Sequence, residues 1–175
     1  MSNPPLDYDA KEMQNGPKDH KSHLYLIDGS GFIFRAFHAL PPLTRIDGTP
    51  INAVYGFTTM LLKILEKTDV DYFCVVFDVA RRNFRHDIYP EYKANRPPPP
   101  PELVPQFPLI RDVCHAFNVA ILEQEGFEAD DLIATYASKA LKENMNVTIV
   151  SSDKDLMQLV KPGVDMLDPL KDRKI

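Results

Sequence analysis

Short apolar runs alternate with longer segments of helical spacing, and this alternation is what most restricts the fold of the 175-residue chain. The runs are strand-sized, and the segments between them carry apolar residues at three- and four-residue intervals. Parallel strands need crossover connections of about a dozen residues or more, usually helices. The pattern predicts an α/β domain with a parallel sheet and helices on both of its faces. We expect strands at residues 23–27, 72–77, 119–122, 147–150 and 164–167, and helices through 32–37, 54–65, 102–117 and 129–143, with a short one starting near Asp153.

Composition fits one soluble globular domain, since 44% of the residues are apolar and 26% are charged. The longest apolar runs are far shorter than the roughly 20 residues that a membrane helix needs.

Residues 1–22 form a polar leader without the pattern of a secretory signal, and we expect a flexible tail there. Cys74 and Cys114 sit in apolar segments away from other zinc ligands, which predicts reduced core thiols in a cytoplasmic protein. The chain reaches Ile175 without an evident closing element, so we expect the parent protein to continue.

Acidic residues follow the C-terminal ends of the predicted strands. In open parallel sheets this edge is where ligands bind, so carboxylates from several loops would meet in one crevice. Helix capping explains any one of them, but capping needs one carboxylate per helix, whereas residues 128–131 contain three and residues 153–155 contain two. The candidate site residues are Asp28, Asp78, Glu128, Asp130, Asp131, Asp153 and Asp155.

So many anions in one place repel one another unless a cation neutralises them. Hard divalent ions such as Mg²⁺ or Mn²⁺ prefer oxygen ligands, and zinc is disfavoured because no set of histidines and cysteines accompanies the acids. Two such ions can generate hydroxide from water and stabilise both oxygens of a phosphodiester displacement. The acids therefore predict metal-dependent phosphoryl hydrolysis.

Residues 81–96 combine basic and aromatic side chains, with a local net charge of +3 in a chain whose net charge is −5. Such a segment can bind a single strand, with cations on phosphates and aromatic rings on bases. The alternative is a solvated loop anchored by a few aromatics. Prolines at 97–101 mark a structural boundary. The segment contains Arg81, Arg82, Arg85, Lys93 and Arg96, with Phe84, Tyr89 and Tyr92 between them, and Arg35 is either a further phosphate contact or simply exposed.

Five segments carry a resemblance to a known family, over residues 24–175. They read LIDGS (26–30), FRAFHA (34–39), YPEYKANR (89–96), EADDLIA (128–134) and SSDKD (151–155). Together they resemble the 5′-nuclease domain of bacterial DNA polymerase I, which is related to flap endonucleases and phage 5′-exonucleases. The resemblance implies a PIN-like, resolvase-like fold over residues 23–175, with residues 81–101 as a helical arch or gateway.

The resemblance also implies an activity: two divalent ions hydrolyse DNA near the junction of a duplex and a displaced 5′ strand. The substrates would be 5′ flaps, nicks and RNA primers in replication and repair, in a cytoplasmic, nucleoid-associated monomer with no membrane or evident protein partner. All seven acids would belong to the metal site, some through water, and Lys93 would join them in catalysis. The implied DNA-binding residues are Arg35, Arg85, Lys93 and Arg96, and Arg81, Arg82 and Tyr92 complete the predicted set.

Two departures from the family pattern bear on activity. The family continues with a further acidic loop and a helix-hairpin-helix element, so the resemblance implies that this stretch folds and binds one metal ion but cuts poorly. Phe34 stands where relatives often have tyrosine. Two alternatives stay open: an RNA-cleaving PIN-type nuclease and a nonenzymatic module that binds DNA ends. An acid-pocket phosphatase or receiver-type domain is disfavoured, because it needs an aspartate nucleophile in an Asp-x-Asp or similar setting, whereas Gly29 and Ser30 follow Asp28.

Overall fold

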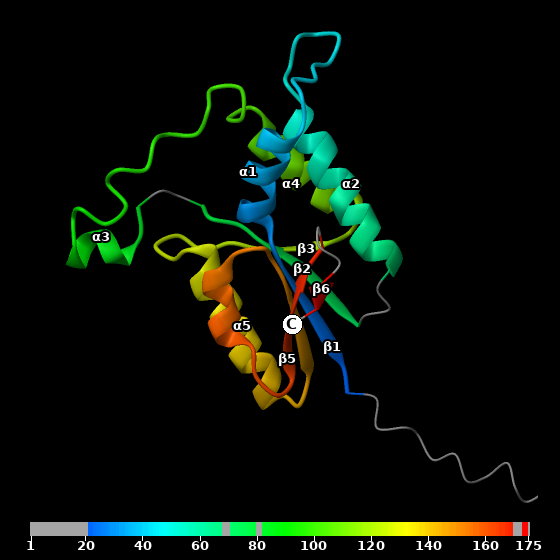
Figure 1. Cartoon of the computed structure of the whole chain (residues 1–175), viewed down its shortest axis with the longest axis vertical. Helices are drawn as coiled ribbons and strands as arrows, with labels where there is room; N and C mark the ends of the chain where they lie inside the picture. The colour runs from blue at the N-terminus through cyan, green and yellow to red at the C-terminus, as the bar shows by residue number, and fades with distance from the viewer. Residues whose placement is uncertain (1–20, 68–70, 80–81, 170–172, 175) are drawn as a thin grey trace, which may run out of the picture.

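A six-stranded sheet forms the centre of the molecule, with strand order β3-β2-β1-β4-β5-β6 (Figure 1). The computed structural model describes residues 21–67, 71–79, 82–169 and 173–174, so most of the predicted leader lies outside the described residues. The first five strands are parallel, as predicted, whereas β6 pairs antiparallel with β5 and was not predicted. The strands are β1 (His23–Asp28), β2 (Tyr72–Val76), β3 (Ala120–Leu122), β4 (Asn146–Val150), β5 (Val164–Asp168) and β6 (Arg173–Lys174).

Helices cover both faces of the sheet because successive strand residues point to opposite sides. Ile27 packs with one apolar cluster, which includes residues of α1 (Gly29–Ala39), α2 (Asn52–Lys67) and α4 (Gln106–Ala116). Its neighbour Leu26 packs with the other, under α5 (Ala129–Lys142) and the 3₁₀ helix η2 (Lys154–Leu159). The predicted helices on both faces are confirmed. In the described ranges no helix is long and apolar enough to cross a bilayer.

The start of α4 differs from the prediction. The helix begins at Gln106 rather than at residue 102, and turns occupy the residues before it. Pro105 explains the late start, since proline suits the beginning of a helix but breaks its interior. Leu103 is nevertheless fully buried, so the apolar spacing extends one turn beyond the helix itself.

Gln106 joins α4 to the beginning of α2 and is completely buried. Its side-chain oxygen accepts hydrogen bonds from the backbone N–H groups of Ala53 (2.8 Å) and Val54 (3.2 Å). Its amide nitrogen donates to the Asn52 side chain (2.9 Å) and to the Glu102 carbonyl (3.0 Å). The side chain thus satisfies helix-end donors that would otherwise be buried without a partner.

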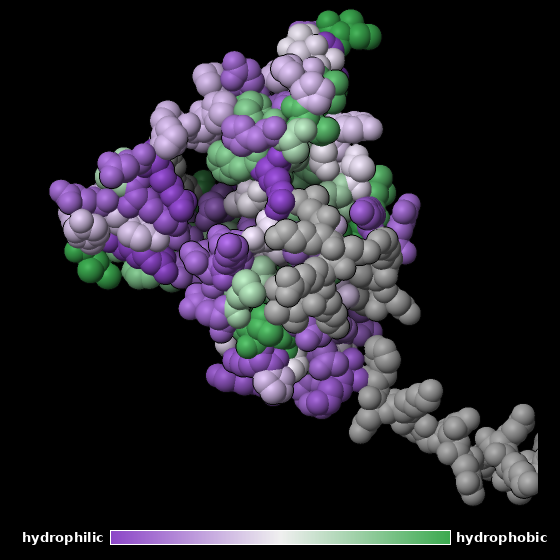
Figure 2. All heavy atoms as spheres, in the orientation of Figure 1, coloured by the Kyte–Doolittle hydropathy of each residue, from purple (hydrophilic) through white to green (hydrophobic). Residues whose placement is uncertain are grey.

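We call residues 82–101 the arch; Arg81, which the prediction included, lies outside the described residues. The arch contains one short helix, α3 (Phe84–Ile88), followed by consecutive turns at residues 90–95. Figure 1 shows α3 standing away from the sheet, and none of its residues is buried. Figure 2 shows hydrophilic side chains over this region and a hollow between it and the rest of the molecule.

Both cysteines lie in the core and form no disulfide, as predicted. Burial raises the pKa of the Cys74 thiol to about 12 and that of Cys114 to about 11. Neither thiol is therefore a reactive thiolate at neutral pH.

The order of the strands locates the ligand-binding edge of the sheet. From β1 the chain moves outward to β2 and β3, and then returns to β4 on the other side of β1. Such a reversal leaves a crevice beyond the C-terminal ends of the two central strands. Asp28 ends β1, and Ser151 and Asp153 follow β4, so these residues lie at the crevice.

Candidate active site

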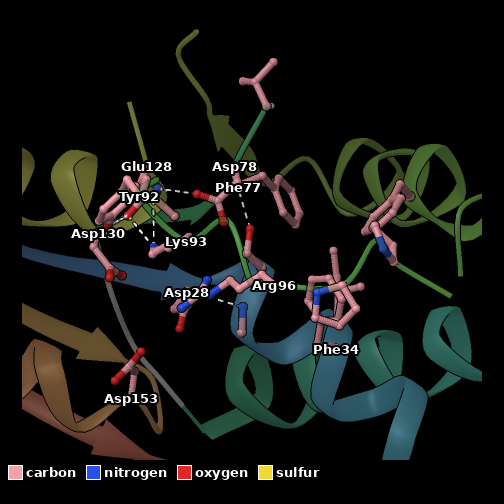
Figure 3. A pocket seen from close by; sticks show the side chains of 18 of the residues that line it. Asp28, Phe34, Phe77, Asp78, Tyr92, Lys93, Arg96, Glu128, Asp130 and Asp153 are labelled. Atoms are coloured by element: carbon pink, nitrogen blue, oxygen red, sulfur yellow. Dashed lines mark hydrogen bonds and ion pairs between the residues drawn. The ribbon is translucent and has the colours of Figure 1, made fainter. Parts of the chain in front are cut away.

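A cavity of about 630 Å³ lies at this edge, under the arch (Figure 3). Four separate loops supply its carboxylates, as the strand-end pattern predicted. A second cavity of about 540 Å³ adjoins it and shares three of the acids. The first is lined by Asp28, Asp78, Glu128, Asp130 and Asp153, and the second by Glu128, Asp130, Asp131, Asp153 and Asp155.

Asp28 is held rigidly between α1 and β4. One carboxylate oxygen accepts the Gly31 N–H (2.8 Å), and the other accepts the Ser151 hydroxyl (2.7 Å). The same buried hydroxyl accepts the N–H of Asp153 (3.0 Å), so Ser151 links two acids of the site. A Cβ at position 31 would lie 2.4 Å from the Asp28 carboxylate, which explains why glycine stands there.

Capping accounts for part of the acidic pattern. Asp28 caps α1, and Asp153 accepts the N–H of Asp155 (2.9 Å) at the start of η2. Asp78 accepts the N–H of Ala129 (2.7 Å) and so caps α5 from a different loop. In the described part of the chain Asp130 forms no such bond. Capping alone therefore does not explain why the sequence keeps an acid at 130.

The electrostatics of Asp130 reflect this crowding. Burial, and then the charges of Asp28, Asp153, Asp78 and Glu128, raise the pKa of Asp130 to about 6. Burial also raises the pKa of Asp28, against the lowering effect of its two hydrogen bonds. A hard divalent cation would relieve both the repulsion and the burial of charge, so these oxygen donors fit Mg²⁺ or Mn²⁺. As arranged here, no three Asp, Glu, His or Cys residues of the described ranges stand at metal-ligand spacing.

Two arch cations face the acids directly. The Lys93 ammonium lies 2.8 Å from both oxygens of Glu128, and Arg85 forms two 2.7 Å bonds to Asp131. Burial acts to lower the pKa of Lys93, but its bonds to Glu128 and Tyr92 outweigh this and raise it. Arg85 lowers the pKa of Asp131, against its partial burial. The residues predicted to hold DNA therefore hold carboxylates in this structure.

The other predicted DNA-binding residues of the described ranges divide into two that line the cavities and two that do not. Arg96 and Tyr92 line both cavities, and the Tyr92 hydroxyl lies 3.3 Å from Glu128. Arg82 is exposed, pairs with Asp87 at 2.8 Å, and lines neither cavity. Arg35 is half-buried on α1 and also lies outside both cavities.

Sequence reasoning missed several residues of the site. Asn83 is buried at the start of the arch, and its amide donates to Glu128 at 2.6 Å. Arg111 lies 5.0 Å from the Phe77 ring centre and pairs with Glu123 at 2.8 Å. Ser151 belongs to the SSDKD segment (151–155) that carries the family resemblance. Asn83 could have been found because asparagine is a preferred residue at the start of a helix. Arg111 gave no signal, because α4 reaches the cavity only in the folded chain.

Asp130→Asn is expected to stabilise the metal-free fold. The pKa of about 6 lies above the ordinary 3.8, so the folded state binds the proton more tightly and loses stability as pH rises from about 4 to about 6. Discounted for partial exposure, the variant should gain about 1 kcal/mol at pH 7.5 and much less at pH 4. Urea unfolding in EDTA at both pH values measures this. A variant less stable than the parent at pH 7.5 would show that Asp130 is structural.

Comparison with known proteins agrees with this architecture. Residues 23–175 match the model of the 5′-3′ exonuclease N-terminal resolvase-like domain. The chain is 60% identical to DNA polymerase I of Rhizobium leguminosarum, over 87% of this chain and 16% of that protein. It is 43% identical to the 5′-3′ exonuclease of Aquifex aeolicus, over 85% of this chain and 52% of that protein. It thus spans a sixth to a half of the length of these relatives.

Solved structures share the fold at low sequence identity. The phage T5 5′-exonuclease with bound divalent zinc ions superimposes with a TM-score of 0.65 at 20% identity, over 87% of this chain and 57% of that one. A T5 flap endonuclease variant with DNA and metal ions gives a TM-score of 0.63, with the same identity and coverage. The predicted resolvase-like fold is confirmed. The chain belongs to the family of 5′-3′ exonuclease N-terminal resolvase-like domains.

Proposed function

We propose that this chain is the catalytic core of a structure-specific 5′-nuclease that hydrolyses DNA phosphodiesters at 5′ ends and flaps. The observation that carries the proposal is one cavity that gathers five carboxylates from four loops beneath a basic and aromatic arch. Family membership and the names of the relatives support it. In the cell the activity would remove RNA primers and flaps during replication and repair.

The acids would hold Mg²⁺ or Mn²⁺, and the family resemblance implies two such ions in the complete domain. Glu128, Asp130 and Asp153 line both adjoining cavities, and their carboxylate oxygens are the kind of donor that such ions prefer. When bound, the ions would make water a better nucleophile and stabilise the charge that develops on the leaving oxygen. Ser151 and Gly31 keep the Asp28 carboxylate in a fixed orientation, which lowers the cost of assembling the site.

The remaining cavity walls fit a nucleic-acid strand. Lys93 and Arg96 line both cavities and can neutralise phosphates of a strand that lies along them. The far end of the first cavity is aromatic, with the Phe34 and Phe107 ring centres 6.4 Å apart. Aromatic faces stack on bases without sequence preference. A single strand could therefore place a phosphodiester at the acids while its neighbouring base meets the rings.

Cleavage of labelled 5′-flap DNA in Mg²⁺, Mn²⁺ or EDTA tests the proposal, with the Aquifex aeolicus exonuclease as positive control. We expect metal-dependent cutting at the junction of duplex and flap. Faster cutting of single-stranded RNA would favour the RNA-cleaving alternative. Folded protein that binds the flap without cutting it would favour a DNA-end-binding module.

Lys93→Ala is expected to weaken binding of a 5′ single-stranded overhang on the order of tenfold, because a charge-assisted hydrogen bond contributes about 1.5 kcal/mol or more. The slope of log K against log salt should become shallower by about 0.7, the value for one lost single-strand phosphate contact. Fluorescence anisotropy in Ca²⁺ over a salt series measures both. Lys139→Ala is the matched control, since Lys139 lies on α5 outside both cavities. Equal losses in the two variants would mean that only net charge matters.

A further inference from the structure

Three residues of the arch lie within hydrogen-bonding distance of Glu128, and a fourth, Arg85, lies 4.0 Å from one of its oxygens. The Lys93 ammonium contacts both carboxylate oxygens at 2.8 Å, the Asn83 amide donates to one at 2.6 Å, and the Tyr92 hydroxyl lies 3.3 Å from the other. The Glu128 side chain is only 15% exposed. Its oxygens are thus turned toward the arch, although the residue belongs to both acidic cavities.

A second attachment lies beside the first. Arg85 makes two parallel 2.7 Å bonds to Asp131, the strongest geometry for a guanidinium and a carboxylate. Apolar burial at α3 is incomplete, because α3 buries none of its residues and Phe84 and Phe127, whose ring centres lie 5.7 Å apart, remain 39% and 41% exposed. Charge pairs therefore hold the arch more than packing does.

The backbone of Lys93 supports this view. Its φ is 52°, in the left-handed region that non-glycine residues seldom adopt. Unfavourable backbone geometry persists where surrounding contacts enforce it. At Lys93 these contacts are the two bonds to Glu128 and the turn bond in which the Arg96 N–H donates to the Lys93 carbonyl (3.0 Å).

We propose that these ion pairs latch the arch closed, and that divalent cation binding opens the latch. The proposal rests on the proposed function, in which Glu128 and Asp131 belong to the metal site. A carboxylate drawn to a divalent ion loses much of its attraction for an ammonium or guanidinium, and the ion itself repels both cations. Lys93 and Arg85 are then released to meet the phosphates of an incoming strand. The latch would keep the cavity covered until metal is present.

Asn83 is the pivot in this scheme. It is 2% exposed, it bridges to Gly126 through the backbone, and the next N–H, of Phe84, donates to the Gly126 carbonyl at 3.0 Å. Neither backbone contact involves charge, so metal binding leaves both in place. The arch therefore opens around Lys93 and stays attached at Asn83.

Hydrogen–deuterium exchange of peptides across residues 84–96 tests the latch, with metal binding followed separately by calorimetry. In EDTA we expect slow exchange, and in saturating Mg²⁺ without DNA at least tenfold faster exchange. Glu128→Gln removes the charge that holds Lys93, so its arch should exchange at least tenfold faster even in EDTA. Asp130→Asn keeps both ion pairs but lacks one acid of the site. At the Mg²⁺ concentration that saturates the parent, its arch should remain slow.

Glu123→Gln is the matched control, because it breaks the 2.8 Å pair with Arg111 without touching the arch and should leave arch exchange unchanged. The latch is overturned if Glu128→Gln exchanges as slowly as the parent. Release by metal is overturned if calorimetry detects no Mg²⁺ binding, or if bound Mg²⁺ leaves arch exchange unchanged or slower. If the protein cleaves flaps but arch exchange does not respond to Mg²⁺, the nuclease proposal stands and the latch proposal fails. If arch exchange responds to Mg²⁺ but the protein does not cleave flaps, the latch proposal stands and the nuclease proposal fails.

Discussion

Asp130→Asn and Asp153→Asn should each lower metal-dependent flap cleavage by about a thousandfold or more, while the folded variants still bind flap DNA. Both acids line the two cavities, and an amide keeps the shape of the carboxylate but cannot supply its charge to a cation. Loss of a group that acts in the transition state lowers the chemical step more than binding. Single-turnover cleavage and fluorescence anisotropy on the same DNA separate the two quantities.

The control for this prediction is Asp112→Asn, which changes an exposed acid of α4 outside both cavities and should cut like the parent. Circular dichroism and thermal unfolding establish that the variants fold. If the two cavity variants unfold, their acids are structural. If they fold and cut normally, the carboxylates belong to a different chemistry.

Gln106→Leu should destabilise the fold by about 3 kcal/mol, the second large effect. The change removes the acceptor for the N–H groups of Ala53 and Val54 and leaves them in a fully buried place. A buried donor without a partner costs about 1–3 kcal/mol, and the lost bonds to Asn52 and Glu102 add to this. Urea unfolding in EDTA gives the difference directly.

Gln124→Leu makes the same chemical change on an exposed loop and should alter stability by about 0.5 kcal/mol or less. A similarly small loss for Gln106→Leu would mean that water or a shifted side chain replaces the bonds. A large loss would identify Gln106 as the residue that joins α2 to α4. Gln106 lines neither cavity, so its substitution also separates stability effects from catalytic ones.

Local pattern was sufficient to predict most elements of the fold. Strand and helix periods depend on neighbours within a few residues, so β1 to β5 and the four longer helices were predicted with small errors at their ends. Two errors in the predicted elements have causes that the apolar period does not show. Pro105 delays α4, and the two-residue strand β6 is too short to carry a period.

The location of the acids was also predictable, because parallel strands bring their C-terminal ends to one edge. Which acids share a cavity was not. Asp131 and Asp155 line only the second cavity, and Asp28 and Asp78 only the first. That division depends on how each loop turns after its strand, which the residue types do not encode in any simple pattern.

The parallel α/β fold, the edge where the acids gather and the family all follow from the residues alone, because each depends on local periods or on short recognisable segments. The contacts of the arch cations depend instead on how distant parts of the chain come together. Lys93 lies 35 residues from Glu128 and Arg85 lies 46 from Asp131. Ion pairing acts over a few ångströms, so it depends on the docking of the whole arch against α5. Two of the predicted DNA-binding cations, Lys93 and Arg85, therefore face acids that the metal site would use.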